Sequence, residues 1–255
     1  MQFEEMGNMS GKTLMLLPGT CCDWQTNFER VIPVLSEKYH LICVNYDGFD
    51  GSDVIFPDMI TVTEKIEQYI QTKHNGRLDG AIGSSLGSSF VGQLVQRENV
   101  HIDHAIFGSP DLDQSGKASA WLQSKLVVPL LTSFTKSEKK QKKTKESLKK
   151  MFLMDDEVAD KFMACFSKFN PESIKNEYYT DLLTHLKDDI NVGHTKAHFI
   201  YANKMGEKYL NRYKKYFHNP DIREFDMQHE QWLFGGDEYA KPVLKAIDEF
   251  MVMPV

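Results

Sequence analysis

Short apolar runs that end at glycine, proline or polar residues recur along the chain, and each of them predicts a buried strand. Between them lie segments whose apolar residues return every three or four positions, the spacing of an amphipathic helix. Strands that alternate with helices predict an α/β fold, with a mostly parallel central sheet and helices on both faces. The expected strands cover residues 13–17, 41–44, 78–82, 105–107, 198–202 and 222–225, and the expected helices cover 24–35, 60–70, 90–95, 208–217 and 243–251.

Residues 113–195 interrupt this alternation and are too many for a plain connection between two strands. Their apolar positions follow mainly helical spacing, as at Trp121 and Leu126. We therefore expect a helical cap over residues 113–195, inserted before the penultimate strand of the sheet. The α/β core would then comprise residues 1–112 and 196–255.

The composition is that of an ordinary globular protein and narrows the possible partners. The chain has 255 residues, of which 41% are hydrophobic and 26% charged, with a formal net charge of −6. This balance does not indicate a nucleic-acid partner, and no run approaches the roughly 18 apolar residues of a membrane span. The first ten residues also lack the basic-then-apolar order of a signal peptide. We expect a cytoplasmic protein, because the four cysteines show neither metal-ligand spacing nor a disulfide framework: Cys21, Cys22, Cys43 and Cys165.

A lysine-rich stretch runs from Lys136 to Lys150, within the expected cap. Its simplest interpretation is a solvated helix face or loop. The alternative is a cationic region that attracts anionic substrates or surfaces.

The sequence Gly83-Ser84-Ser85-Leu86-Gly87 has the G-x-S-x-G pattern of a nucleophile elbow. An expected strand precedes it and an expected helix follows it, which is the context that the motif requires. A serine on such a turn has a strained backbone, and side chains at the two glycine positions would collide with neighbouring elements. The helix N-terminus after the turn directs backbone N–H groups at developing negative charge. Ser85 is therefore the candidate nucleophile, and the alternative is a turn that is merely rich in glycine and serine.

A serine hydroxyl group needs a base within hydrogen-bond reach, which is usually a histidine. Of the nine histidines, His229 has the best position, because it follows the last expected strand and precedes the last expected helix. That position places it at the carboxyl edge of the sheet, where the turn with Ser85 also lies. His229 is therefore the candidate base, and the alternative is an ordinary histidine of a surface loop.

These features together resemble the α/β-hydrolase superfamily, and the resemblance covers nearly the whole chain. It includes the turn Leu17-Pro18-Gly19-Thr20 after the first expected strand, the segment YDGFDGS at residues 46–52, and the order of serine before histidine. Proline precedes the glycine of the first turn where the superfamily more often has histidine. The resemblance implies that the backbone N–H groups of Thr20 and Leu86 form an oxyanion hole. Each such donor typically stabilises the transition state by about 3 kcal/mol.

The resemblance leaves the acid of the catalytic triad open. The superfamily usually places it after the strand that precedes the histidine strand, and there Glu207 lies two residues beyond the expected slot near Met205. A known variation places the acid after the preceding core strand, where Asp111 follows Gly108-Ser109-Pro110. Asp111 and Glu207 are therefore the main candidates, and Asp113 or no acid at all are the remaining ones. Each candidate also has a plain interpretation, as a charge at a helix start or as a turn aspartate.

We expect a serine hydrolase of the carboxylesterase type that cleaves a small-molecule carboxylic ester through an acyl-enzyme. Thioesters and amides are open to the same machinery, which requires no metal or organic cofactor. The alternatives are a non-catalytic ligand-binding protein on the hydrolase scaffold and an acyltransferase, in which an alcohol or thiol replaces water. The sequence assigns no oligomeric state.

Overall fold

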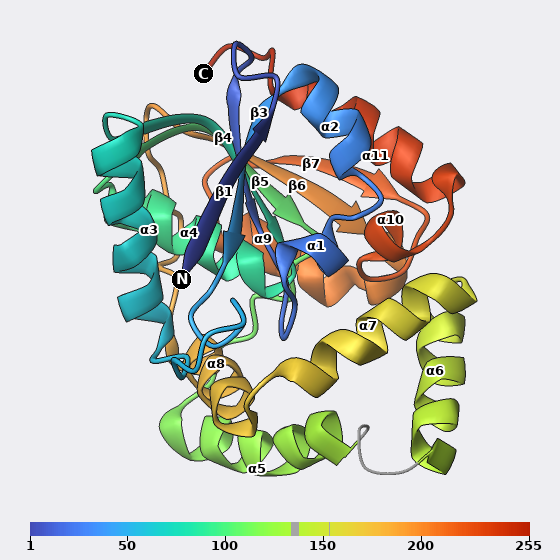
Figure 1. Cartoon of the computed structure of the whole chain (residues 1–255). Helices are drawn as coiled ribbons and strands as arrows, with labels where there is room; N and C mark the ends of the chain where they lie inside the picture. Colours follow the sequence, from blue (N-terminus) through green and yellow to red (C-terminus); the bar gives the residue numbers. More distant parts are fainter. Residues whose placement is uncertain (134–137, 153) are drawn as a thin grey trace.

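The computed structural model describes residues 1–133, 138–152 and 154–255, and its centre is a sheet of seven strands (Figure 1). The strands lie in the order β1-β3-β2-β4-β5-β6-β7. Strand β1 pairs antiparallel with β3, whereas the other neighbouring pairs are parallel. The mostly parallel sheet predicted from the sequence is therefore confirmed. The strands are β1 Gln2–Gly7, β2 Thr13–Leu17, β3 His40–Asn45, β4 Arg77–Ser84, β5 His101–Gly108, β6 Lys196–Ala202 and β7 Asp221–Phe225.

Helices cover both faces of the sheet, because its central strands are apolar on both sides. In β2, for example, residues 14–17 are fully buried. In the described part of the chain, no helix is long and apolar enough to cross a membrane. One face carries α3 Met59–Lys73, α4 Leu86–Arg97 and α9 Glu207–Tyr216, and the other carries α1 Trp24–Asn27, α2 Ile32–Lys38, α10 Gln231–Phe234 and α11 Asp237–Phe250.

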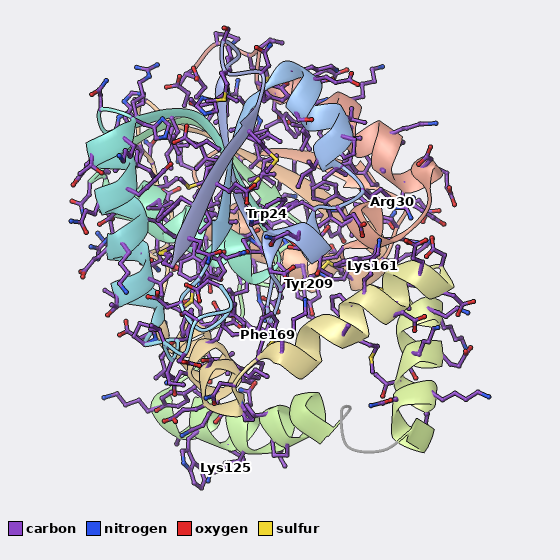
Figure 2. The ribbon with its side chains drawn as sticks, in the orientation of Figure 1. Trp24, Arg30, Lys125, Lys161, Phe169 and Tyr209 are labelled. Carbon is purple, nitrogen blue, oxygen red and sulfur yellow. The ribbon has the colours of Figure 1, made fainter. Side chains whose placement is uncertain are left out.

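A helical insertion lies between β5 and the penultimate strand β6, as the sequence predicts, and gathers at one end of the sheet (Figure 1). Its last helix is bound to the core, where Ser173 Oγ accepts a hydrogen bond from Phe56 N–H at 3.1 Å. Another of its helices meets the core at Lys161, whose Nζ lies 2.5 Å from the carboxylate of Glu29 (Figure 2). The helices of the insertion are α5 Lys117–Ser133, α6 Glu138–Phe152, α7 Asp156–Lys168 and α8 Pro171–Leu183.

Two elements at the start of the chain differ from the sequence prediction. The sequence predicts no strand before residue 13, yet β1 pairs with β3 there. Most side chains of β1 are exposed at the edge of the sheet, so no apolar run marks this strand. The single helix expected over residues 24–35 is instead two helices, α1 and α2, separated by a turn. Pro33 lies in the first turn of α2, where proline favours a helix start but would interrupt a continuous helix.

The lysine-rich stretch lies mostly in α6, and its first two residues, 136 and 137, are outside the described residues. Lys142 and Lys143 are exposed. Lys145 and Lys149 each lie close to Asp156 at the start of α7, at 3.1 and 3.0 Å. The described part of this stretch is therefore a solvated helix face that is joined to α7 by ion pairs.

Candidate active site

The serine turn lies where three backbone segments come very close together. Strand β4 ends at Ser84 and α4 follows one residue later, so Ser85 forms the turn between them, with a φ angle of 47°. A Cβ atom at Gly87 would lie 2.0 Å from the carbonyl oxygen of Leu17, and one at Gly83 would lie 2.3 Å from the backbone of α4. Glycine is therefore required at both positions, in agreement with the elbow motif.

His229 lies on the loop between β7 and α10, and its ring reaches the serine turn. The distance between His229 Nε2 and Ser85 Oγ is 3.1 Å, which is hydrogen-bond distance. Burial lowers the pKa of His229 because it disfavours the charged imidazolium, and the charge of Asp111 opposes part of this shift. The imidazole is therefore neutral near pH 7 and can accept a proton.

Of the three candidate acids, Asp111 is the one that the structure brings to His229. It follows β5 and lines, together with His229, a hollow of about 510 Å³. Burial raises the pKa of Asp111, and the charge of His229 acts in the opposite direction. Asp113 instead forms an ion pair with Arg212. Glu207 is exposed in the first turn of α9, where a carboxylate is favoured by the helix dipole.

The turn that carries Thr20 lies beside the serine turn. A Cβ atom at Gly19 would lie 3.4 Å from Ser85 Cβ, so the two turns are in contact. Tyr46, which is fully buried, fixes the first turn by donating a hydrogen bond to the carbonyl oxygen of the adjoining proline at 3.0 Å. Leu86, the other residue that the resemblance implies, is the first residue of α4. Both backbone positions therefore flank Ser85.

Glu230, the residue after His229, is a buried carboxyl group that the sequence patterns do not single out. It is 3% exposed, and its oxygens accept hydrogen bonds from Ser84 Oγ at 2.6 Å and from Ser85 N–H at 3.2 Å. Burial raises its pKa to about 8. Its position next to the candidate base is the one feature of the sequence that could have drawn attention to it.

Helix α8 presents two further carboxyl groups to the core, of which Glu177 is fully buried and Asp181 is half-buried. They are four residues apart and so lie on the same face of the helix. Glu177 accepts a hydrogen bond from Cys21 N–H at 3.0 Å, and Asp181 accepts one from the hydroxyl group of Ser89. Burial raises the pKa of each to about 8. Their spacing is the sequence signal that could have shown them, but it is equally common on solvated helix faces.

Left-handed backbone conformations concentrate in the loops around Ser85. Such conformations cost a non-glycine residue about 1–3 kcal/mol and persist where the surrounding structure holds them. Of the nine non-glycine residues with a positive φ angle in the described part of the chain, five lie in the turn after β2, between β4 and α4, after β5 and after β7. The residues are Cys21 with a φ angle of 55°, Ser85 with 47°, Ser109 with 45°, Leu112 with 48° and Glu230 with 56°.

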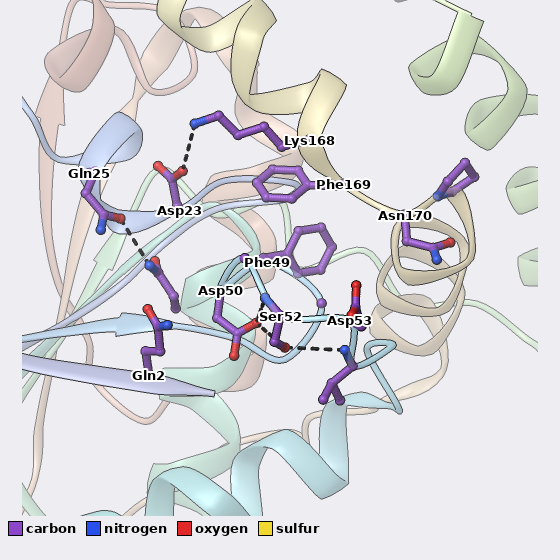
Figure 3. A pocket seen from close by; sticks show the side chains of 15 residues that line it. Gln2, Asp23, Gln25, Phe49, Asp50, Ser52, Asp53, Lys168, Phe169 and Asn170 are labelled. Atoms are coloured by element: carbon purple, nitrogen blue, oxygen red, sulfur yellow. Dashed lines mark hydrogen bonds and ion pairs between the residues drawn. The ribbon is translucent and has the colours of Figure 1, made fainter.

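A second hollow, of about 530 Å³, lies where the loop after β3 meets the joint between α7 and α8 (Figure 3). Phe49 and Asp50 reach it from the loop, and Lys168 and Phe169 reach it from the insertion. Asp23 also lines it, with a carboxylate oxygen 4.0 Å from Lys168 Nζ. The hollow therefore lies between the insertion and the core, and Asp23 places it close to the turn that carries Thr20.

Comparison with known proteins gives matches in structure but not in sequence. No family model and no curated protein matches the chain. An esterase from a marine microorganism matches it with a TM-score of 0.70 and 16% identity over 98% of both chains. MenH from S. aureus matches with a TM-score of 0.69 and 16% identity, again over 98% of both chains. An epoxide hydrolase from Bacillus megaterium matches with a TM-score of 0.72 and 11% identity, over 99% of this chain and 96% of its own.

Proposed function

Because the chain has the α/β-hydrolase fold that its motifs predict, we propose that it is a serine hydrolase. In this proposal Ser85 is the nucleophile, His229 is the general base, and Asp111 orients the base. The backbone N–H groups of Thr20 and Leu86 form the oxyanion hole. The observation that carries the proposal is the 3.1 Å distance between His229 Nε2 and Ser85 Oγ, on a strained turn between a strand and a helix.

The proposed reaction is a two-step acyl transfer. Ser85 Oγ attacks the carbonyl carbon of the substrate while its proton moves to His229 Nε2. The two backbone N–H groups hold the negative oxygen of the tetrahedral intermediate. His229 then gives the proton to the leaving group, and the bond between the carbonyl carbon and the leaving group breaks. Water, deprotonated by His229, releases the acid from Ser85 in the same way.

The proposal assigns the orienting acid to Asp111. Its half-buried position in the same hollow as His229 and the mutual influence of their pKa values support this choice. Glu207 is solvated, and Asp113 is engaged by Arg212. A carboxylate in the place of Asp111 also counteracts the low pKa that burial gives to His229, so that the imidazolium can form during the reaction.

The proposed substrate is a small-molecule carboxylic ester, and thioesters and amides suit the same chemistry. The esterase among the similar structures supports this class of substrate. We also propose that residues 113–195 form a cap over the core of residues 1–112 and 196–255. The contact of Glu177 with Cys21 supports this division, because it places α8 directly over the turn that carries Thr20.

A cytoplasmic location remains part of the proposal. Cys43 is a buried thiol that forms no disulfide within the described part of the structure, which suits a reducing compartment. The side chain of Cys165 is outside the described part of the structure.

Labelling with a fluorophosphonate, measured by intact mass, tests the proposed function. We expect one adduct on the wild-type protein, none on Ser85→Ala, and one on Ser10→Ala, a control at an exposed serine. The proposal fails if the wild-type protein gains no adduct or if Ser85→Ala is labelled equally well. The absence of an adduct would favour the non-catalytic ligand-binding alternative, whereas equal labelling of Ser85→Ala would place the reactive nucleophile at another residue.

A further inference from the structure

One buried side chain joins the loop of His229 to the turn of Ser85, although the two are far apart in the sequence. Glu230 Oε2 accepts a hydrogen bond from Ser84 Oγ at 2.6 Å, and Glu230 Oε1 accepts one from Ser85 N–H at 3.2 Å. The same N–H group also donates to the carbonyl oxygen of Gly108, in β5, at 3.0 Å. Strand β5, the serine turn and the histidine loop therefore meet at a single backbone amide.

We infer that Glu230 is a positioning residue, whose carboxyl group holds the loop of His229 against the turn of Ser85. The inference rests on the proposed function, because it concerns the distance over which the serine proton moves. Glu230 adjoins His229 in the chain, so a shift of its backbone changes the separation of His229 Nε2 from Ser85 Oγ. A displacement of about 1 Å can lower a reaction rate on the order of 100-fold.

The backbone on both sides of this contact needs such a restraint. Ser85 and Glu230 both have left-handed φ angles, of 47° and 56°, which are unfavourable for residues with a side chain. Helix α10 begins directly after Glu230 and buries its apolar side chains, including Trp232, in the core. The loop is therefore fixed by apolar packing at one end. The hydrogen bonds of Glu230 fix it at the end that faces Ser85.

The charge of Glu230 links this restraint to pH. Burial raises its pKa to about 8, and the charge of Asp111 adds to this effect. Tyr213 on α9 is a further titratable group that interacts with it, and His229 adjoins it in the chain. The carboxyl group is thus mostly neutral at pH 7. Above about pH 8 its negative charge stands beside Ser85, where the substrate oxygen also becomes negative, so we expect acylation to slow.

Two substitutions of Glu230 distinguish the effect of its hydrogen bonds from the effect of its negative charge. Glu230→Gln keeps polar atoms for both hydrogen bonds but has no charge, whereas Glu230→Ala removes both contacts. Glu238→Gln, at an exposed glutamate of α11, is the matched control. Hydrolysis of p-nitrophenyl acetate is measured between about pH 6 and pH 9, together with the rate of fluorophosphonate labelling.

We expect Glu230→Ala to lower kcat at least about tenfold and to leave KM within about twofold. Glu230→Gln should keep kcat within about threefold at pH 7 and lose the decline above about pH 8 that the wild-type protein shows. An unchanged kcat in Glu230→Ala overturns the inference. If that variant does not fold, Glu230→Asp takes its place, because its shorter side chain cannot reach both Ser84 Oγ and Ser85 N–H from the same backbone position, and an unchanged kcat in Glu230→Asp overturns the inference. A decline in Glu230→Gln equal to that of the wild-type protein overturns the link to pH.

The ring-nitrogen NMR shifts of His229 distinguish a failure of this inference from a failure of the proposed function. Ser85→Ala supplies the spectrum of a histidine without its serine contact. We expect Glu230→Ala to move the His229 signals toward that spectrum and Glu230→Gln to leave them in place. Wild-type signals in Glu230→Ala would overturn the positioning role even if labelling is normal. If the wild-type protein is not labelled, the hydrolase proposal fails and the NMR comparison still decides the role of Glu230.

Discussion

Glu177 Oε2 accepts a hydrogen bond from the backbone N–H of Cys21 at 3.0 Å, and this contact joins α8 to the turn that carries Thr20. Glu177 is fully buried, and its other oxygen, Oε1, has no hydrogen-bond partner in the described part of the structure. A buried carboxyl group with an unsatisfied oxygen strongly disfavours ionisation, and burial raises the pKa of Glu177 to about 8. The insertion therefore holds a mostly neutral acid against the proposed oxyanion hole.

We predict that Glu177→Gln reduces the loss of stability at high pH. The pKa of Glu177 rises from an ordinary value of 4.5 to about 8 in the folded protein, so folding retains a proton that the unfolded chain releases. Its contribution to the free energy of unfolding is therefore complete below pH 4.5 and is lost as the pH rises through about 8.

Urea unfolding between about pH 5 and pH 9 tests this prediction. Relative to Glu177→Gln, the wild-type protein should lose at least about 1 kcal/mol over this range. Glu172→Gln, at an exposed glutamate of the same helix, should follow the wild-type protein. A difference between wild type and Glu177→Gln that stays constant with pH would contradict the prediction.

Asp111→Asn tests the proposed orienting acid. Asparagine carries no charge to stabilise the imidazolium of His229, so we expect kcat to fall about 100-fold or more. Glu207→Gln and Asp113→Asn should change kcat less than about threefold, because these side chains are solvated or paired elsewhere. The measurement is kcat for p-nitrophenyl acetate at pH 7. A large loss in Glu207→Gln alone would move the acid to the slot that the superfamily pattern favours.

The sheet and the helical insertion could be predicted from the sequence because their signals are local. The buried strands are short apolar runs, and the elbow has its whole G-x-S-x-G pattern within five residues, from Gly83 to Gly87. Strand β1 lacks such a signal, since an edge strand exposes most of its side chains. The other edge strand, β7, was predicted because it still carries apolar residues, Ile222 and Phe225.

The buried carboxyl groups could not be predicted, because their role depends on which backbone amides they meet in the folded chain. Glutamate is rarely buried, so the sequence does not indicate that Glu177 and Glu230 lie in the interior. For the same reason, the sequence could not decide whether Asp111 or Glu207 is the acid of the catalytic triad. Both follow core strands at plausible distances, and the path of each loop in space decides which one lies beside His229.

We predict a loss of stability in mild acid that depends on His198. This residue is fully buried, with Nδ1 3.0 Å from Asp221 Oδ2 and Nε2 3.2 Å from His104 Nδ1. Burial lowers its pKa from 6.5 to about 4, so the unfolded chain binds a proton that the folded protein does not accept. The free energy of unfolding should therefore fall as the pH drops from about 6.5 toward 4, on the order of 3 kcal/mol for this group.

Thermal unfolding between about pH 7 and pH 4.5 tests the role of His198. His198→Gln should lose less Tm over this range than the wild-type protein, because glutamine does not titrate. His218→Gln, at an exposed histidine, should lose as much as the wild-type protein. Parallel Tm curves for His198→Gln and the wild-type protein would show that another group causes the acid sensitivity.

Gly87→Ala should destabilise the whole fold and not only the serine turn. Its Cβ atom would lie 2.0 Å from the carbonyl oxygen of Leu17 and 2.7 Å from the carbonyl carbon, and Leu17 belongs to the central strand β2. These backbone atoms cannot move aside without disturbing the pairing of β2 with its neighbours, so we expect a loss of about 3 kcal/mol in urea unfolding. Gly116→Ala, whose Cβ would meet nothing within 4 Å, should unfold at the wild-type midpoint. Wild-type stability in Gly87→Ala would mean that α4 lies farther from β2 than the serine turn requires.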